Sequence, residues 1–282
     1  MTQPPQLTDR DALRRTRARA QRLGVARFLH DIAIDNIKER LTEVNRSFTA
    51  PAIVTGHPAI WADAFPGATV VPDTDVLDLQ AGAHDLVIHA MAMHWAGDPI
   101  GQLIQCRHAL RPDGLFLAVL PGGQTLAELR AALAQAESDL TGGLSPRVVP
   151  MAELRDLGAL LQRAGMALPV ADSMPFTATY PALSALVRDL RGMGETNALA
   201  QRHRAPAPRG LFALAARHYA EAFAGPDGRL PATFELVFLT GWAPDASQPQ
   251  PLRPGSARAR LADALDTRET PLPDPAAPSH RD

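Results

Sequence analysis

The run from His84 to Gly123 constrains the fold of this chain more than any other segment. It reads HDLVIHAMAMHWAGDPIGQLIQCRHALRPDGLFLAVLPGG. Two apolar stretches, 85–88 and 115–120, have the composition of strands that are buried on both faces of a parallel sheet. Between them, apolar residues recur at helical spacing over 100–110. This order predicts a strand, a right-handed crossover helix and a second strand, which together form half of a doubly wound α/β sheet.

The remaining elements surround this unit. An apolar stripe over 28–48 predicts a helix packed on the sheet, and RPDG at 111–114 predicts a turn that ends the preceding helix, since Gly114 tolerates a positive φ. Four further segments are predicted as helices (124–140 and 151–164) or strands (174–180 and 233–240). The chain then divides into an Arg-rich N-terminal helix (1–27), an α/β core (28–180), a helical insertion or lid (181–224), a final core strand (225–243) and a Pro-rich, largely disordered tail (244–282).

The composition excludes several classes of protein. With 282 residues and 46% hydrophobic content, the chain has enough material for the core of one large domain. A formal charge of −2 argues against bulk nucleic-acid binding. The single cysteine, Cys106, excludes an intrachain disulfide and a Cys-rich zinc site, and fits a reducing compartment. Because no apolar run approaches about 20 residues and no signal core is present, we expect a cytoplasmic bacterial protein.

Several sequence strings carry a family resemblance. HDLVI, the aromatic HW and LRPDGLF together resemble the half of class I S-adenosylmethionine-dependent methyltransferases that follows the cofactor loop. GGQTLAELRAALAQAESDLTGGLSPRVVPM, YPALSALVRDLRGMGETN and DGRLPATFELVFLTGW resemble one branch, the complex I assembly-factor family of methyltransferase-fold arginine hydroxylases. A more distant resemblance is to the malonyl-carrier-protein methyltransferases of biotin synthesis. The resemblance runs roughly from Thr8 to Leu261, and it implies a methyltransferase sheet, S-adenosylmethionine as cofactor and a complex I subunit as protein substrate.

The segment that should hold this cofactor departs from the family pattern. Such proteins place a glycine-rich turn after the first strand and an acid, which binds the ribose, after the second. Here the corresponding segment, 51–61, reads PAIVTGHPAIW and keeps only Gly56. From Ile53 to Asp85 there are only about 30 residues, roughly half of what two βα units and a third strand need. We therefore predict a sheet truncated in its first half, with a helix and a strand lost or reduced to stubs, and a degenerate S-adenosylmethionine site.

The cofactor candidates lie where the first three strands should end. The aspartates of VVPDTDVLDLQ are possible replacements for the ribose-binding acid, and the alternative is that they form turns and a solvated edge. The candidates for cofactor binding are Thr55, Gly56, His57, Asp73, Asp78, His89 and Ala90.

Two groups of residues are candidates for the substrate site. His94 and Trp95 follow the strand at 85–88, at the edge where open α/β sheets bind ligands. RGMGETN at 191–197 supplies Glu195, whose carboxylate can bind a guanidinium through two charge-assisted hydrogen bonds. The alternatives are loop packing for the His-Trp pair and a structural helix cap for the bend. The substrate candidates are His94, Trp95, Gly192, Gly194, Glu195 and Asn197.

The chemistry is harder to assign than the location. Methyl transfer needs mainly alignment of donor and acceptor, so it leaves no obligatory catalytic motif. Hydroxylation of a C–H bond needs an oxidant, and an iron site normally has two histidines and a carboxylate. His84, His89 and His94 do not have metal-ligand spacing, and the first and last of them should lie at opposite ends of a strand. We therefore predict no metal site, and the catalytic residues stay unassigned.

The N-terminal segment is rich in arginine. A capping box at 8–11 opens a helix and leads into a stretch with seven arginines between Arg10 and Arg27. These arginines form either a solvated, flexible helix or a contact surface for an acidic partner or anionic lipid. At an anionic lipid surface, each basic residue contributes roughly 1 kcal/mol to the binding free energy. The second alternative predicts peripheral contact with the inner face of the membrane.

Three functions remain open at this stage. The first is an enzyme that resembles the complex I assembly arginine hydroxylases and acts on a respiratory-complex subunit during NADH dehydrogenase assembly. The second is a non-catalytic assembly chaperone on the same fold. The third is a carboxyl O-methyltransferase of a carrier protein or small molecule. SPRVVPM and GMGETN favour the first two, and the shortened segment before Asp85 favours the second over the first.

Overall fold

The computed structural model describes residues 6–249 and 260–268, which fall into two units, Met1–Ala246 and Ser247–Asp282. The first unit contains the whole sheet, and the second contains the short helix α9 (Leu261–Ala264). Much of the predicted disordered tail (250–259 and 269–282) lies outside the described residues. Within the described part of the chain, no helix has the length and apolar character needed to cross a bilayer.

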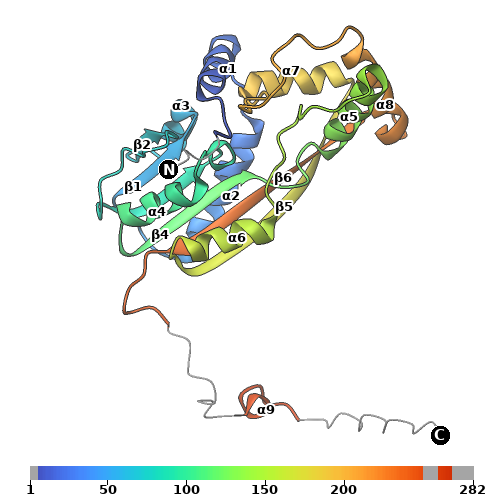
Figure 1. Cartoon of the computed structure of the whole chain (residues 1–282). Coiled ribbons are helices and arrows are strands. Elements are labelled where there is room, and N and C mark those ends of the chain that lie inside the picture. Colours follow the sequence, from blue (N-terminus) through green and yellow to red (C-terminus); the bar gives the residue numbers. More distant parts are fainter. Residues whose placement is uncertain (1–5, 250–259, 269–282) are drawn as a thin grey trace, which may run out of the picture. The chain divides into compact units, whose positions relative to one another are not determined.

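A six-stranded sheet with the order β2-β1-β3-β4-β6-β5 forms the centre of the first unit (Figure 1). Its strands are β1 (Pro51–Thr55), β2 (Thr69–Pro72), β3 (His84–Ala90), β4 (Leu110–Pro121), β5 (Ala167–Tyr180) and β6 (Leu230–Trp242). The first four are parallel, and β6 runs antiparallel to both β4 and β5. The chain passes from β1 outward to β2 and then back across β1 to β3, so the sheet has a switch point at the carboxyl ends of β1 and β3. This topology confirms the predicted doubly wound, mostly parallel α/β fold.

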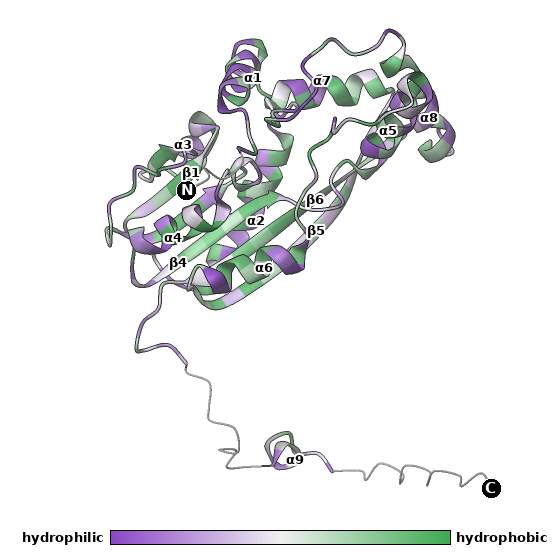
Figure 2. Ribbon diagram, in the orientation of Figure 1, coloured by the Kyte–Doolittle hydropathy of each residue, from purple (hydrophilic) through white to green (hydrophobic). Residues whose placement is uncertain are grey.

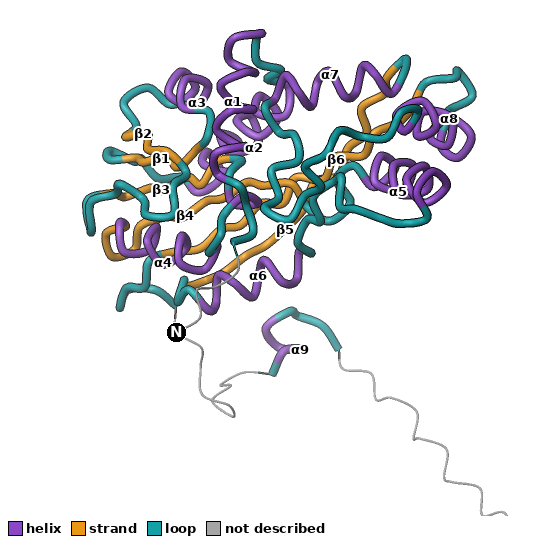
Figure 3. Tube along the Cα trace, turned by 45° about the horizontal axis from the view of Figure 1, so that its top comes forward, coloured by secondary structure: helices purple, strands orange, loops and turns teal. Residues whose placement is uncertain are grey.

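Helices cover both faces of the sheet. On one face lie α4 (Pro99–Ala109) and α6 (Leu154–Arg163), as Figure 3 shows. The other face packs against α2 (Phe28–Val44), α3 (Pro58–Ala64), α5 (Ala127–Thr141), α7 (Leu183–Met193) and α8 (Leu211–Phe223). Alternate residues of β4 enter the two cores, Phe116 on the α4 side and Leu117 on the α2 side, as the pleat of a strand requires. Figure 2 shows β4 and β6 as largely apolar and α1 (Arg10–Leu23) as largely polar.

The first half of the sheet is short, as predicted, but less is lost than the length suggests. Helix α3 has 7 residues and β2 has 4, so both elements are present in reduced form. Among the described residues, the missing element is a helix between β2 and β3, where 73–83 forms turns and coil. The prediction of a helix and a strand lost or reduced to stubs is therefore confirmed, because two-turn helices and four-residue strands fit into very little chain.

The turn predicted at 111–114 lies inside a strand. Helix α4 passes directly into β4 at Leu110, and the pairing of β3 with β4 shifts register between His84 and Leu86. The positive φ falls on Asp113 (57°) and not on Gly114. A short polar side chain tolerates this conformation, and the Asp113 carbonyl also accepts a hydrogen bond from Arg46 at 3.1 Å.

Strand β5 forms one edge of the sheet and is longer than predicted. It begins at Ala167, although the apolar pattern indicated a start at residue 174. A register irregularity lies between Ala167 and Val170, and the strand contains Pro169 and Pro175. Proline cannot donate to a strand ladder, so its place is on an edge strand such as this one.

Candidate functional site

The carboxyl ends of β1, β2 and β3 lie side by side. Thr55 at the end of β1 pairs with Pro72 of β2 and with Ala90 of β3. The next residues along two of these strands, Gly56 and Asp73, therefore lie at the same edge of the sheet. We call the space between Gly56 and Asp73 the β1–β2 crevice.

The other cofactor candidates lie beneath this crevice or outside it. Thr55, His57, His89 and Ala90 are buried, whereas Asp78 is exposed. Nε2 of His89 lies 2.9 Å from Oε1 of Gln102, and the Gln102 amide donates to the Thr74 carbonyl at 2.9 Å. Burial lowers the pKa of His89 to about 4, so its imidazole is neutral and serves as a link between β3, α4 and the loop after β2.

The guanidinium of Arg17, from α1, fills the β1–β2 crevice. Its Nη1 donates to both carboxylate oxygens of Asp73, each at 2.9 Å. A Cβ placed on Gly56 would lie only 2.0 Å from the same nitrogen, so the glycine leaves the space that the guanidinium takes. Arg10 adds a second cation 3.6 Å from Asp73. Arg17 is thus a buried side chain, although the sequence offered only a solvated or a surface role for these arginines.

Helix α1 lies beside α7 and the segment that follows it (Figure 1), and contacts with this segment hold α1 in place. Asp9 caps α1 by accepting from the Ala12 amide at 2.9 Å, while its own amide donates to the Ala198 carbonyl at 2.7 Å. The Thr16 hydroxyl donates to the Gly194 carbonyl at 2.9 Å. These contacts place Arg17, one residue further along α1, in the crevice.

Gly194 is the residue on which this close packing depends most. Its φ is 77°, and a Cβ on it would lie 2.9 Å from the Arg17 Cα. Gly142 has a similar φ of 68° with no atom within 4 Å of the same position. We expect Gly194→Ala to lower the free energy of unfolding by about 1–3 kcal/mol more than Gly142→Ala, since only Gly194→Ala adds overpacking to the left-handed strain. Urea unfolding of both variants measures this difference, and equal losses would contradict the packing described here.

Glu195 lies where the crevice meets the substrate candidates. Its Oε1 is 3.5 Å from Nη2 of Arg17 and 3.5 Å from Nε2 of His57. Its Oε2 is 3.2 Å from Nε2 of His94 and accepts a hydrogen bond from the Trp95 indole. One carboxylate therefore joins α1, the loop after β1 and the short helix η1 (Met93–Trp95) after β3.

The Glu195 carboxylate is ionised. Burial alone would raise its pKa, but the Arg17 guanidinium and the imidazoles of His57 and His94 hold the pKa well below its ordinary value. Several buried polar atoms in this cluster nevertheless have no hydrogen-bond partner among the described residues. They are Glu195 Oε1, His57 Nε2, His94 Nδ1, Arg17 Nε and Arg17 Nη2. Unpaired buried polar atoms are costly, so the cluster has unused capacity for a polar ligand.

His30, from α2, completes the cluster from below. Its ring centroid lies 4.6 Å from that of His57, and its Nδ1 accepts a hydrogen bond from the Trp61 indole at 3.2 Å. Burial, reinforced by the neighbouring His57, lowers the pKa of His30 to about 3, so the ring is neutral at physiological pH.

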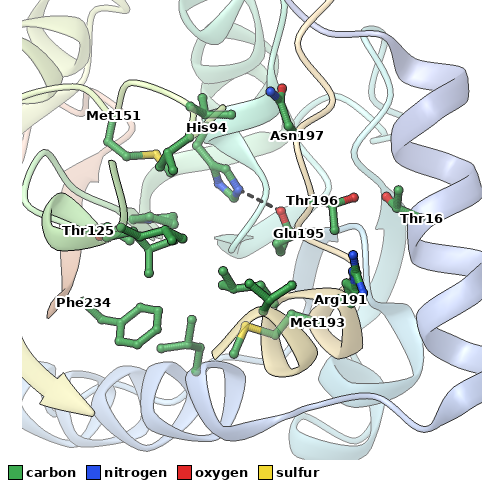
Figure 4. Close-up of a pocket in the computed structure, with 18 of the residues that line it drawn as sticks. Thr16, His94, Thr125, Met151, Arg191, Met193, Glu195, Thr196, Asn197 and Phe234 are labelled. Atoms are coloured by element: carbon green, nitrogen blue, oxygen red, sulfur yellow. Dashed lines mark hydrogen bonds and ion pairs between the residues drawn. The ribbon is translucent and has the colours of Figure 1, made fainter. Parts of the chain in front are cut away.

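A cavity of about 390 Å³ opens on the other side of Glu195 (Figure 4). Thr125 and Phe234 lie across it from Glu195, and His94 and Asn197 lie near the carboxylate. The apolar part of its wall includes Leu126, Leu129, Leu133, Val187, Leu190 and Phe234. Three arginines, Arg19, Arg147 and Arg191, also border it. The cavity is therefore mainly apolar, with charge at its border.

The predicted substrate residues are only partly brought together. His94, Trp95, Glu195 and Asn197 border the cavity, and Asn197 also donates to the Pro146 carbonyl at 2.6 Å. Gly192 instead packs against Ala26, whose amide donates to the Gly192 carbonyl at 3.1 Å, and Gly194 packs on α1. Among the described residues, no group of three or more His, Cys, Asp or Glu side chains has a geometry that could hold a metal ion.

The residues present do not fit an adenosyl cofactor in this arrangement. Methyltransferases of this class need open space beside the glycine after the first strand and a free acid for the ribose. Here Arg17 takes the space beside Gly56 and both oxygens of Asp73. The β1–β2 crevice and the cavity are separate, because neither Gly56 nor Asp73 borders the cavity.

Arg17 and His30 were missed by the sequence analysis. Helical phase is a signal that marks Arg17, because it shares a face of α1 with the buried Leu13 and Ala20. That face is the one that packs inward. His30 has the same kind of signal, since it lies one turn before the buried Ile34.

Comparisons with known proteins agree with this fold. No family model matches the chain. Arginine-hydroxylase NDUFAF5 of Danio rerio is 37% identical over 198 residues, which are 70% of this chain and 61% of that protein. The human NDUFAF5 is 37% identical over 192 residues, 68% of this chain and 55% of that protein. The malonyl-[acyl-carrier protein] O-methyltransferase of Xylella fastidiosa is 36% identical over 179 residues, 64% of this chain and 58% of that protein.

Among solved structures, the YcgJ protein of Bacillus subtilis has a TM-score of 0.49 at 13% identity, with 74% of this chain and 98% of that chain covered. The matched part of this chain spans between about half and two thirds of the length of the curated relatives named above. The resemblance read from the sequence is confirmed: this chain is a relative of the NDUFAF5 arginine hydroxylases and, beside them, of the malonyl-[acyl-carrier protein] O-methyltransferases.

Proposed function

We propose that this chain binds an arginine side chain of a respiratory-complex subunit in the cavity beside Glu195, and acts on it during NADH dehydrogenase assembly. The observation that carries this proposal is the Glu195 carboxylate, which is ionised and borders the cavity. A guanidinium is the cation that a carboxylate binds with two parallel hydrogen bonds. The arginine hydroxylases among the relatives act on the same side chain by name.

The shape of the cavity supports the same ligand. Its volume of about 390 Å³ has room for a long side chain, and its apolar wall suits the aliphatic stem of arginine. Arg17 already places a guanidinium 3.5 Å from Glu195 Oε1 on the opposite side of the carboxylate. Glu195 thus has the negative charge and the acceptor oxygens that a guanidinium ligand needs.

One observation favours a second candidate, a non-catalytic assembly chaperone. Arg17 occupies the crevice in which a methyltransferase would hold its cofactor. A protein that binds its partner without turnover needs no cofactor. This candidate keeps the same arginine-binding cavity and differs only in the absence of chemistry.

The proposed place of action is the cytoplasmic side of the bacterial inner membrane. Arg14, Arg15 and Arg22 are exposed on α1, away from the crevice. Basic side chains gain roughly 1 kcal/mol each near an anionic lipid surface. Binding of the purified protein to vesicles with and without anionic lipid, at rising salt, tests this part of the proposal.

The central experiment compares complex I subunits from a deletion strain that expresses different variants. Mass spectrometry reads the fraction of a subunit arginine that carries one additional oxygen atom. We expect this fraction to fall at least ten-fold with Glu195→Gln, because the neutral amide cannot hold the guanidinium by charge. Glu221→Gln on α8 is the matched control, since Glu221 is exposed and does not border the cavity.

The outcomes separate the candidates. Wild-type levels of modification with Glu195→Gln, in protein of normal stability, would exclude Glu195 as the arginine-binding residue. A modification that persists in the deletion strain while complex I fails to assemble would support the chaperone.

A further inference from the structure

We infer that Arg17 is an internal occupant of the β1–β2 crevice, and that an adenosyl cofactor can enter only after α1 has moved away. Arg17 then determines which ligand the crevice accepts. This inference concerns the crevice and not the cavity, so it does not rest on the proposed function.

The first argument is mutual exclusion. A ribose bound at the end of β2 needs the oxygens of Asp73 as acceptors. Both oxygens already accept from Arg17 Nη1 at 2.9 Å. The cofactor must also lie against the protein backbone at Gly56, where the same guanidinium would be 2.0 Å from even a single added carbon. Cofactor and guanidinium therefore cannot occupy the crevice together.

The second argument is that Arg17 fits the crevice imperfectly. A guanidinium has five N–H donors, and in a well-matched arginine site most of them are used. Here only Nη1 makes hydrogen bonds, while Nε and Nη2 are buried without a hydrogen-bond partner among the described residues. The guanidinium therefore closes the crevice while two of its buried nitrogens make no hydrogen bond to any described residue, which is unfavourable. A ligand that uses the polar groups of the crevice more fully can replace the guanidinium.

The third argument is that α1 can move without disturbing the sheet. Its buried residues Ala12 and Leu13 belong to a small separate cluster with Trp95 and Ala198, not to either core of the sheet. Gly24, with a φ of 93°, ends α1, and no atom lies within 4 Å of the place that a Cβ on it would take. A glycine in open space at the junction with α2 is suited to act as a hinge.

The first test measures binding of S-adenosylhomocysteine by calorimetry. We expect Arg17→Ala to bind it at least ten-fold more tightly than the wild type. The apparent affinity of the wild type is reduced by the small fraction of molecules in which the crevice is open. Arg15→Ala is the matched control, since Arg15 is exposed on the same helix, and it should bind like the wild type. Weaker binding by Arg17→Ala, or no heat from any variant, would overturn the inference.

A second test does not depend on removing a buried charge. Thr8 and Leu199 form an antiparallel bridge, in which the Cα atoms lie about 4.5–5.5 Å apart, within the range of a disulfide. In Thr8→Cys/Leu199→Cys protein, oxidation should lock α1 over the crevice. The native Cys106 is buried, and burial raises the pKa of its thiol, so it does not compete.

The locked protein is compared with itself after reduction. We expect the oxidised form to bind S-adenosylhomocysteine at least ten-fold more weakly than the reduced form, while Thr8→Cys alone shows no redox dependence. Equal affinity of the oxidised and reduced forms would show that the crevice accepts the cofactor with α1 in place, and would overturn the inference. The arginine modification in cells is a separate readout, so either proposal can fail alone.

Discussion

Replacing Asp73 with alanine is expected to lower the free energy of unfolding by about 3–5 kcal/mol, because it leaves the buried Arg17 cation without its hydrogen-bonding partner. Glu195 remains 3.5 Å from Arg17, but it makes no hydrogen bond to the guanidinium. Urea unfolding monitored by circular dichroism gives the difference, provided that the slope of the transition is unchanged.

Two further variants make this result specific. Asp75→Ala removes a carboxylate that pairs with Arg10 on the surface, where its side chain is 73% exposed, and should cost about 0–1 kcal/mol. Asp73→Ala/Arg17→Met removes both charges of the pair, and the methionine keeps an apolar side chain in the place of Arg17. This double variant should recover most of the unfolding free energy that Asp73→Ala loses. Equal small losses for Asp73→Ala and Asp75→Ala would mean that Arg17 leaves the crevice at little cost.

Stability is also expected to fall as the pH is lowered from about 6.5 towards 4, before most carboxylates are protonated. Burial lowers the pKa of His30 to about 3 and that of His89 to about 4, whereas both titrate near 6.5 in the unfolded chain. Below pH 6.5 the unfolded chain therefore binds more protons than the folded one. The free energy of unfolding is complete above this pH and declines by up to about 1.4 kcal/mol per pH unit for each histidine, until its folded pKa is reached.

The matched controls are histidine variants. His30→Gln and His89→Gln should each reduce the slope of unfolding free energy against pH in this window, whatever their effect at pH 8. His108→Gln should keep the wild-type slope, because His108 is exposed. Glu195 acts in a different window: its folded pKa lies well below the ordinary value, so its contribution is present above about pH 4.5 and is lost as the pH falls further. A flat profile down to pH 4.5 would contradict the burial of neutral imidazoles.

The elements that could be predicted from the sequence are those that are buried on both sides. The strands β3 and β4 each contain a buried apolar run, 86–88 and 115–120, with a helix between them, and burial specifies that pattern. The first seven residues of β5 lie on an exposed edge, so no apolar run marks their start. Helix α3 and strand β2 are too short to show any periodicity, which is why the sequence predicts a shortened first half without the bounds of its elements.

The site follows the same division. His94 and Trp95 could be placed from their position after a strand, and Glu195 from the bend after a helix. Their meeting with Arg17 could not be predicted, because it depends on how α1 docks against the segment after α7, across more than a hundred residues of chain. Seven arginines of similar sequence surroundings precede α2, and only packing distinguishes the one that enters the crevice.

Strand β5 forms an edge of the sheet, and an edge strand affects how copies of a protein associate at high concentration. An edge strand of 14 residues offers a template on which a neighbouring molecule can polymerise. Pro169 and Pro175 remove amide donors from that template, and the irregular pairing near Ala167 bends it. The outer edge of β5 thus carries, in its own two prolines and its irregular start, features that resist amyloid-like growth.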